Sequence, residues 1–309
     1  MDKTFRHFVL AVQRAFNDFD PKIKEHSYEE SLKDDPPIFI VGSPRAGSTM
    51  LFQILCGQFQ LSYISNIMAA FPSWMVRFVS WLPRTATGYR GDIRESRYGY
   101  VPGLLSPNES GKILARWLEP SQDPDHQIFV KRTFGAITKF SGCPMLMKNQ
   151  NRLTVNMARL EEIFGNPRYI FIKRDPLYTA QSILIARRET LQDDSAWFSA
   201  KPPGYQEQLG KDPFYQVLWQ VLALEHIVEK SSQNIPRERF FSLDYEDFCA
   251  APGNYLHGLL EKFGLTWKEG AAPDDLTLNP SKRIKLPRED WEKLTQVYQE
   301  IKDANLFED

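Results

Sequence analysis

PPIFIVGSPRAGSTMLFQILCGQF, residues 36–59, predicts a strand, a tight loop and the start of a helix. Residues 38–41 are β-branched and aromatic, which suits a strand buried on both faces. Residues 42–47 are rich in Gly, Ser and Pro, and from Ser48 onward apolar residues recur at helical spacing. Such a unit aims backbone N–H groups and the positive end of a helix at one point. The sequence therefore predicts an anion-binding loop.

This loop departs from the signature of nucleoside-triphosphate binding at one position. Gly42 and Gly47 have the spacing of GxxxxGK[ST], but Ser48 stands where that motif has Lys. A P-loop NTPase uses this Lys together with Mg²⁺ to neutralise the β- and γ-phosphates. The cation here is Arg45, inside the loop. An Arg in this place suits a phosphosulfate, because the transferred sulfuryl group carries less negative charge than a phosphoryl group.

A second anion motif follows another predicted strand. Residues 168–173, RYIFIK, read as a buried strand, and Asp175 and Pro176 suit the N-cap and first position of a helix. Arg174 ends the strand and Ser182 lies eight residues later. An Arg can grip a phosphate bidentately and a Ser hydroxyl can add a hydrogen bond. Two separate phosphate-binding sites at the ends of neighbouring strands are therefore expected.

The two motifs together resemble those of a known family. GSPRAGSTML is similar to the 5′-phosphosulfate loop of the sulfotransferases that use 3′-phosphoadenosine 5′-phosphosulfate (PAPS), and IFIKRDPLYTAQS to their 3′-phosphate motif. The resemblance implies an α/β fold of the P-loop NTPase-like sulfotransferase type, with a mostly parallel sheet flanked by helices. We expect a single domain over residues 1–309. A helical extension over residues 1–35 and a helical acceptor-binding cap over residues 60–140 are expected within it.

The resemblance also implies roles for individual residues. The 5′-phosphosulfate is expected to lie on Ser43, Pro44, Arg45, Ala46, Gly47, Ser48 and Thr49. Arg45 would also stabilise charge on the leaving bridge oxygen. Lys148 ends the predicted strand 144–148, where α/β folds place ligands, and is the expected second cation near the transferred group.

The other end of the nucleotide has its own expected residues. Arg174 and Ser182 would hold the 3′-phosphate, and Tyr245 is similar to a tyrosine that lies near the adenine in the family. Lys282 and Arg283 occupy the place of the family's late basic loop, although they do not match its Arg-Lys-Gly form. An ordinary solvated basic loop is the alternative interpretation.

The general base does not follow from the resemblance. Cytosolic animal sulfotransferases use the His of a Lys-Thr-His segment, and Gln150 stands in that position, where it cannot accept a proton. Glu109, at a predicted helix start, is the first candidate, and His126 is the second because an unperturbed His titrates near neutral pH. Each also suits a structural role, and for Glu109 this is capping of the predicted helix.

The whole chain adds few further constraints. The 309 residues carry a formal net charge of −1, which gives no sign of nucleic-acid binding. Cys56, Cys143 and Cys249 are far apart and lack metal-ligand spacing, so we expect apolar packing roles and no metal. No run of about 18 apolar residues and no signal peptide is present, so a cytoplasmic protein is expected.

The acceptor is indicated only in outline. Residues 63–81 are apolar and aromatic, which fits either a core helix pair or the wall of a pocket for an apolar alcohol, lipid or polyketide-like molecule. Peripheral membrane contact is a further alternative. Arg90, Arg94 and Arg97 either line an anion site or form a solvated face, and residues 192–212 suit a mobile substrate lid.

The expected activity is sulfuryl transfer from PAPS to a hydroxyl or an amine. A P-loop kinase or NTPase is the main alternative enzyme, and it would require Mg²⁺ and ATP. A non-catalytic nucleotide-binding protein is the other alternative, because the Lys-Thr-His base is absent.

Overall fold

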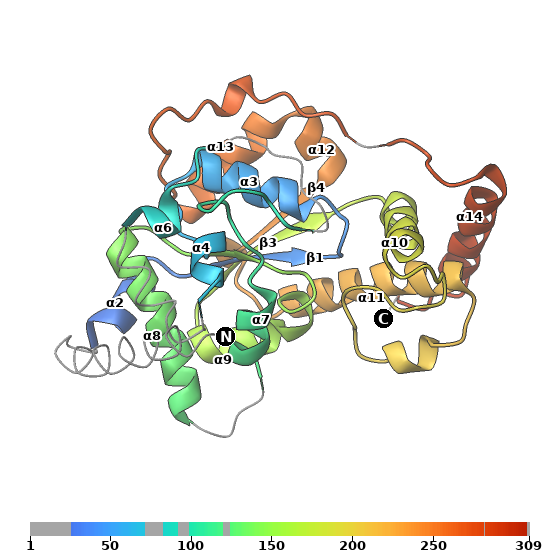
Figure 1. The fold of residues 1–309 in the computed structure, drawn as a ribbon, viewed down its shortest axis with the longest axis horizontal. Coiled ribbons are helices and arrows are strands. Elements are labelled where there is room, and N and C mark those ends of the chain that lie inside the picture. The colour runs from blue at the N-terminus through green and yellow to red at the C-terminus, as the bar shows by residue number, and fades with distance from the viewer. Residues whose placement is uncertain (1–25, 72–82, 92–98, 120–123, 281, 308–309) are drawn as a thin grey trace, which may run out of the picture.

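Four parallel strands in the order β2-β1-β3-β4 form the sheet of this protein (Figure 1). The computed structural model describes residues 26–71, 83–91, 99–119, 124–280 and 282–307. The strands are β1 (Ile38–Gly42), β2 (Leu146–Lys148), β3 (Arg168–Lys173) and β4 (Phe240–Asp244). The α/β fold with a parallel sheet is as the sequence predicts.

Helices cover both faces of this sheet. Those described are α2 (His26–Asp34), α3 (Ser48–Gln58), α4 (Asn66–Ala69), α6 (Pro83–Thr87), α7 (Gly111–Trp117), α8 (Pro124–Ser141), α9 (Met157–Phe164), α10 (Pro176–Thr190), α11 (Pro213–Ser232), α12 (Tyr245–Ala250), α13 (Pro252–Phe263) and α14 (Arg288–Asp303). None of these helices is long and apolar enough to cross a membrane.

The alternation of side chains along β1 divides the core into two layers. Ile38 and Ile40 face α3, α12 and α13, which lie above the sheet in Figure 1. Phe39 and Val41 face α8, α9 and α11, which lie below it. All four side chains are fully buried, as expected for the central strand of a covered parallel sheet. A third apolar cluster joins α10, α11 and α14 beside the sheet.

Several predicted elements have the expected bounds. β3 begins and ends as predicted, and the Asp175 side chain caps α10 by accepting a hydrogen bond from Leu177 N at 2.8 Å. The predicted capping role of Glu109 is wrong, because α7 begins only at Gly111 and its N-cap is Ser110, in the left-handed conformation. The expected N-terminal amphipathic helix lies outside the described residues, as do residues 72–82 of the aromatic stretch.

The base of the anion loop is tied to the sheet at Gly42. Its φ of 133° favours glycine, and a Cβ there would lie 2.5 Å from the carbonyl oxygen of Ile172 on β3. The Thr154 hydroxyl accepts a hydrogen bond from Gly42 N at 3.1 Å and donates one to Gly42 O at 2.9 Å. The loop therefore leaves β1 in one fixed direction.

Glu225 of α11 is a buried carboxyl in a mostly acidic environment. Its pKa is raised to about 7, mainly by burial; Lys173 opposes this shift, and Glu229, Asp244 and Asp175 contribute to it. Lys173 donates a hydrogen bond to Glu229 at 2.6 Å rather than to Glu225. A carboxyl whose pKa is raised by folding binds its proton more tightly in the folded state.

We therefore expect the free energy of unfolding to fall as the pH rises from about 4.5 to about 7. Glu225→Gln should remove this loss and stabilise the protein by about 3 kcal/mol at pH 8, with little effect at pH 4. Urea unfolding of both proteins across this pH range measures the difference. Glu229→Gln, at the half-exposed partner of Lys173, is the control, and its difference from wild type should stay within about 1 kcal/mol. A difference for Glu225→Gln that does not change with pH would contradict the assignment.

Candidate functional site

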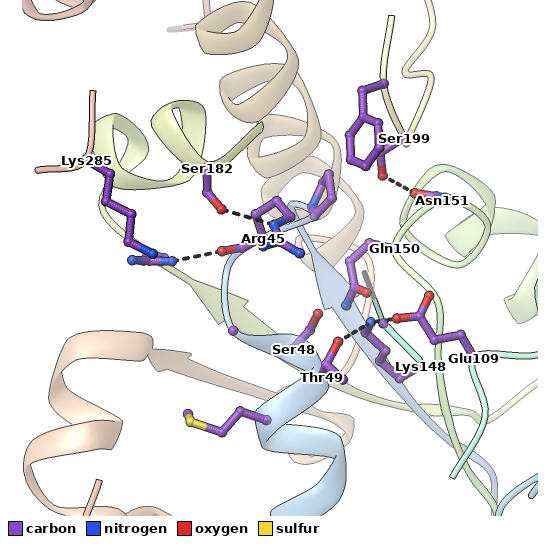
Figure 2. A pocket seen from close by; sticks show the side chains of 16 residues that line it. Arg45, Ser48, Thr49, Glu109, Lys148, Gln150, Asn151, Ser182, Ser199 and Lys285 are labelled. Atoms are coloured by element: carbon purple, nitrogen blue, oxygen red, sulfur yellow. Dashed lines mark hydrogen bonds and ion pairs between the residues drawn. The ribbon is translucent and has the colours of Figure 1, made fainter. Parts of the chain in front are cut away.

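A pocket of about 430 Å³ opens at the carboxyl ends of β1, β2 and β3 (Figure 2). This is the position where open α/β sheets bind ligands, since the chain leaves β1 and its neighbours in different directions. The pocket is lined by Pro44, Arg45, Gly47, Ser48, Thr49, Met50, Gly99, Glu109, Lys148, Gln150, Asn151, Arg174, Ser182, Phe198, Ser199 and Lys285. Both predicted phosphate motifs therefore contribute to a single pocket.

The loop between β1 and α3 has the backbone geometry of an anion site. Arg45 has a φ of 69° and Gly47 a φ of 92°, so the loop turns sharply before α3 begins at Ser48. The first N–H groups of a helix have no partner within the helix, and the first turn of α3 carries no acidic residue. A Cβ on Gly47 would overlap the Tyr245 ring, so this position requires glycine.

The two predicted phosphate grips contact each other directly. Arg45 Nε donates a hydrogen bond to Ser182 Oγ at 3.0 Å, and Arg174 Nη1 donates one to the carbonyl oxygen of Arg45 at 3.0 Å. The Arg174 guanidinium also stacks on the Tyr245 ring, 4.7 Å from its centroid, and lies 3.9 Å from the Glu246 carboxylate. Arg45, Arg174 and Ser182, which come from two distant parts of the sequence, thus form one side of the pocket.

Lys148 lies on the other side of the pocket, at the end of β2. Its side chain is almost fully buried, and its ammonium donates a hydrogen bond to Thr49 Oγ1 at 2.8 Å and pairs with the Glu109 carboxylate. Burial lowers the pKa of Lys148, Glu109 opposes this shift, and the charge of Arg45 adds to it. The ammonium is therefore held between the anion loop and a carboxylate (Figure 2).

Glu109 reaches the pocket from the segment between β1 and β2. Asn149 Nδ2 donates a hydrogen bond to its carbonyl oxygen at 3.1 Å. Gly99, with a φ of 90°, lies against the Glu109 carboxylate so closely that a Cβ would overlap it. The Glu109 carboxylate therefore lies in the pocket, between Gly99 and Lys148, and outside α7.

Not every predicted site residue reaches the pocket. His126 lies near the start of α8 with its Nε2 3.3 Å from the carbonyl oxygen of Trp117, and it is not among the lining residues. Tyr245 packs beneath the loop, against Gly47. Ser43 and Ala46 are buried in the loop without lining the pocket. Arg90 is exposed outside the pocket, and Arg94 and Arg97 lie outside the described residues.

The late basic segment contributes a different residue from those predicted. Lys282 and Arg283 have exposed side chains outside the pocket lining, whereas Lys285 lines it. Gln181 of α10 holds this segment, because its Oε1 accepts hydrogen bonds from Lys285 N at 2.7 Å and Leu286 N at 3.1 Å. The cluster of basic residues indicated this segment as part of the site, but the sequence alone did not show which of its cations lines the pocket.

The segment expected to be a mobile lid is anchored by buried side chains. Arg187 of α10, which is fully buried, donates from Nη1 to the carbonyl oxygen of Asp194 and to Gln216 Oε1, both at 2.9 Å. Gln220 Nε2 donates to the carbonyl oxygens of Phe198 at 2.8 Å and Ala200 at 2.7 Å. This part of the segment is therefore a fixed wall of the pocket.

The sequence analysis predicted a substrate-lid role for residues 192–212 but did not single out the two of them that line the pocket. Phe198 and Ser199 line the pocket, and the Ser199 hydroxyl donates a hydrogen bond to Asn151 Oδ1, which follows β2. Ser199 has a φ of 73°, which is uncommon for a residue with a side chain. Only an unusual backbone conformation marks this position, and no sequence motif encodes it.

Sequence and structure comparisons match this chain to known sulfotransferases. The model of the sulfotransferase family matches residues 36–269. Sulfotransferase STF9 from Mycobacterium avium has a similar fold, with a TM-score of 0.53 at 16% identity, covering 91% of this chain and 82% of that chain. The sulfotransferase domain of the Synechococcus PCC 7002 olefin synthase gives a TM-score of 0.45 at 15% identity, covering 85% of this chain and 94% of that chain.

A third solved structure, the sulfotransferase domain from the curacin biosynthetic pathway, has a TM-score of 0.47 at 15% identity and covers 86% of this chain and 97% of that chain. A sequence search among curated proteins found no match. At 16% identity the STF9 structure shows a similar fold alone. The family match spans most of the chain, from the strand before the anion loop to beyond α13, and the protein therefore belongs to the sulfotransferase family.

Proposed function

We propose that this protein transfers a sulfuryl group from PAPS to a hydroxyl group of a small-molecule acceptor. The observation that carries the proposal is the arrangement of one pocket with two ends. Arg45, Arg174 and Ser182 gather at one end, and the Lys148–Glu109 pair lies at the other. PAPS carries phosphate groups at the 3′ and 5′ positions of its ribose, and the cations at the first end would bind them. The transfer step needs a cation and a base at the second.

The residues nearest the transferred group have complementary tasks in this reaction, and they are Arg45 from the first end and the Lys148–Glu109 pair from the second. Arg45 stabilises the charge that develops on the bridging oxygen as its bond to sulfur breaks. Lys148 balances the charge on the sulfuryl oxygens. Glu109 takes the proton of the acceptor hydroxyl as that oxygen bonds to sulfur, and the products are 3′,5′-ADP and a sulfate ester. Glu109 suits this role because its carboxylate lines the pocket beside Lys148, where an acceptor hydroxyl would meet the transferred group.

The nucleotide fits the residues at the first end. Arg174, Ser182 and Lys285 supply donors for the 3′-phosphate, and the loop of residues 43–49 supplies backbone and hydroxyl donors for the 5′-phosphosulfate. The buried Ser43 hydroxyl has no hydrogen-bond partner among the described residues, which supports a ligand at the loop. Lys282 and Arg283 belong to the same segment as Lys285 but do not line the pocket, so we assign them a weaker role.

The acceptor would bind on the side of Glu109. This proposal gives residues 60–140 an acceptor-binding role, because Gly99 and Glu109 of that segment line the pocket. Phe198 adds an aromatic surface to the same pocket, and Tyr100 and Leu104, beside Gly99, are exposed apolar side chains. These features favour an acceptor with an apolar surface next to its hydroxyl group.

The nucleotide assignment predicts selective stabilisation of the protein. At about 100 times its dissociation constant, 3′,5′-ADP should stabilise the folded state by about 2.7 kcal/mol and raise Tm by about 5 °C. 5′-ADP lacks the 3′-phosphate and should have a much smaller effect at the same concentration. Differential scanning fluorimetry with 3′,5′-ADP, 5′-ADP and ATP–Mg²⁺ measures this. A larger shift with ATP–Mg²⁺ would indicate a kinase or NTPase instead.

Arg45→Ala should lower turnover by about 10²–10³, since it removes a preorganised donor from the transition state. The measurement is transfer of ³⁵S from labelled PAPS to a panel of phenols and aliphatic alcohols, with circular dichroism to confirm the fold. Arg90→Ala, at an exposed arginine outside the pocket, is the matched control and should keep wild-type turnover. Near-wild-type turnover of Arg45→Ala would refute the assigned role.

The assignment of the base predicts a change in the pH profile. Glu109→Gln keeps the shape of the side chain but cannot accept a proton, so kcat should fall by about 10²–10⁴ and the limb of the profile that reports the base should disappear. His126→Asn removes the other candidate and should leave the profile as it is in wild type. The pH–rate profiles of the three proteins decide between the two residues. An unchanged profile for Glu109→Gln would exclude Glu109.

A further inference from the structure

Gln150 presents a buried amide to the pocket without a hydrogen bond. Its side chain is 3% exposed and lines the pocket, and its Nε2 has no hydrogen-bond partner among the described residues. A buried donor that is left unpaired costs about 1–3 kcal/mol. Such a group in a pocket indicates that its partner arrives with a ligand.

The end of β2 determines which side chains face the ligand. Lys148 and Gln150 both line the pocket, whereas Asn149 between them turns away and donates its hydrogen bond to the Glu109 carbonyl oxygen. Gln150 lies in the turn that follows β2, two residues after Lys148, and both side chains line the pocket.

The amide lies among the cations assigned to the reacting group. Figure 2 shows Gln150 between the Arg45 loop and the Lys148–Glu109 pair. Lys148 also contacts Thr49 of the loop at 2.8 Å, so the amide and the anion loop border the same small space. A group attached to a phosphate on the loop would enter this space. A sulfuryl group has three oxygens that share one negative charge, and Arg45 and Lys148 already supply positive charge there. A neutral donor can serve a remaining oxygen without adding excess charge.

We propose that Gln150 is a catalytic residue whose carboxamide donates a hydrogen bond to a sulfuryl oxygen of the bound donor. This inference rests on the proposed function, because it needs PAPS in the pocket. It gives Gln150 a task other than that of a base, which an amide cannot perform. The contact exists with PAPS and is absent with 3′,5′-ADP, because 3′,5′-ADP has no sulfuryl group.

Comparison of these two nucleotides tests the contact without any knowledge of the acceptor. Isothermal titration calorimetry gives the dissociation constants of PAPS and 3′,5′-ADP for wild type and Gln150→Leu. Loss of a hydrogen bond to a charged group should weaken PAPS binding about tenfold. Binding of 3′,5′-ADP should change less than about twofold. Because the amide has no partner in the free protein, Tm of unliganded Gln150→Leu should equal or exceed that of wild type.

Ser182→Ala is the matched control within the same pocket. Both nucleotides carry the 3′-phosphate, so this variant should weaken the two by the same factor and leave their ratio unchanged. Gln150→Glu keeps the shape of the side chain, removes the donor and adds a negative charge, so it should weaken PAPS binding more than Gln150→Leu does. It also serves if Gln150→Leu does not fold.

Three results would overturn the proposal. One is a PAPS to 3′,5′-ADP ratio in Gln150→Leu equal to that of wild type, as expected if the amide faces the acceptor instead. Another is a failure of both Gln150 variants to fold, or a large fall in their Tm, which would show a structural role. The last is a wild-type protein that binds neither nucleotide, and this result rejects the proposed function as well.

Discussion

The burial of one ammonium group, that of Lys148, is the constraint on which the site depends. Removing this charge from water is costly, and two contacts from other parts of the chain offset the cost. Thr49 belongs to the helix after the anion loop, and Glu109 to the segment before α7. The ammonium therefore joins β2, the first turn of α3 and the segment before α7 at one point, and a displaced Glu109 would leave a buried charge without its carboxylate.

At the other end of the pocket a cation also joins distant parts of the chain, but its partner there is a backbone carbonyl oxygen and not a carboxylate. Arg174 holds the carbonyl oxygen of Arg45, and Arg45 in turn reaches Ser182. The guanidinium that would meet one phosphate thus also fixes the loop that would meet the other. The two ends of a nucleotide would be bound by a single connected set of residues, which explains why motifs far apart in sequence occur together.

The sequence predicted the sheet, its helices and both phosphate motifs, because buried strands, N-caps and glycine-rich turns have strong local signals. β3 and the Asp175 cap are examples. It placed Glu109 in a helix that begins only at Gly111, since a left-handed Ser110 interrupts the expected start. It could not distinguish Lys285 from Lys282, because contacts with Gln181 decide which cation turns inward. It indicated residues 192–212 as a possible lid but not that Phe198 and Ser199 line the pocket, because their place depends on side chains of α10 and α11.

The way this wall is fastened has a consequence for the evolution of the protein. Arg187 and Gln220 hold main-chain oxygens of the wall, and these atoms are the same whatever residue bears them. Substitutions at positions 198 and 199 would therefore change the surface offered to an incoming molecule while the path of the chain stays fixed. The residues that support the wall are thus different from the residues that contact the bound molecule. New acceptor preferences can therefore arise by exchange of a few side chains.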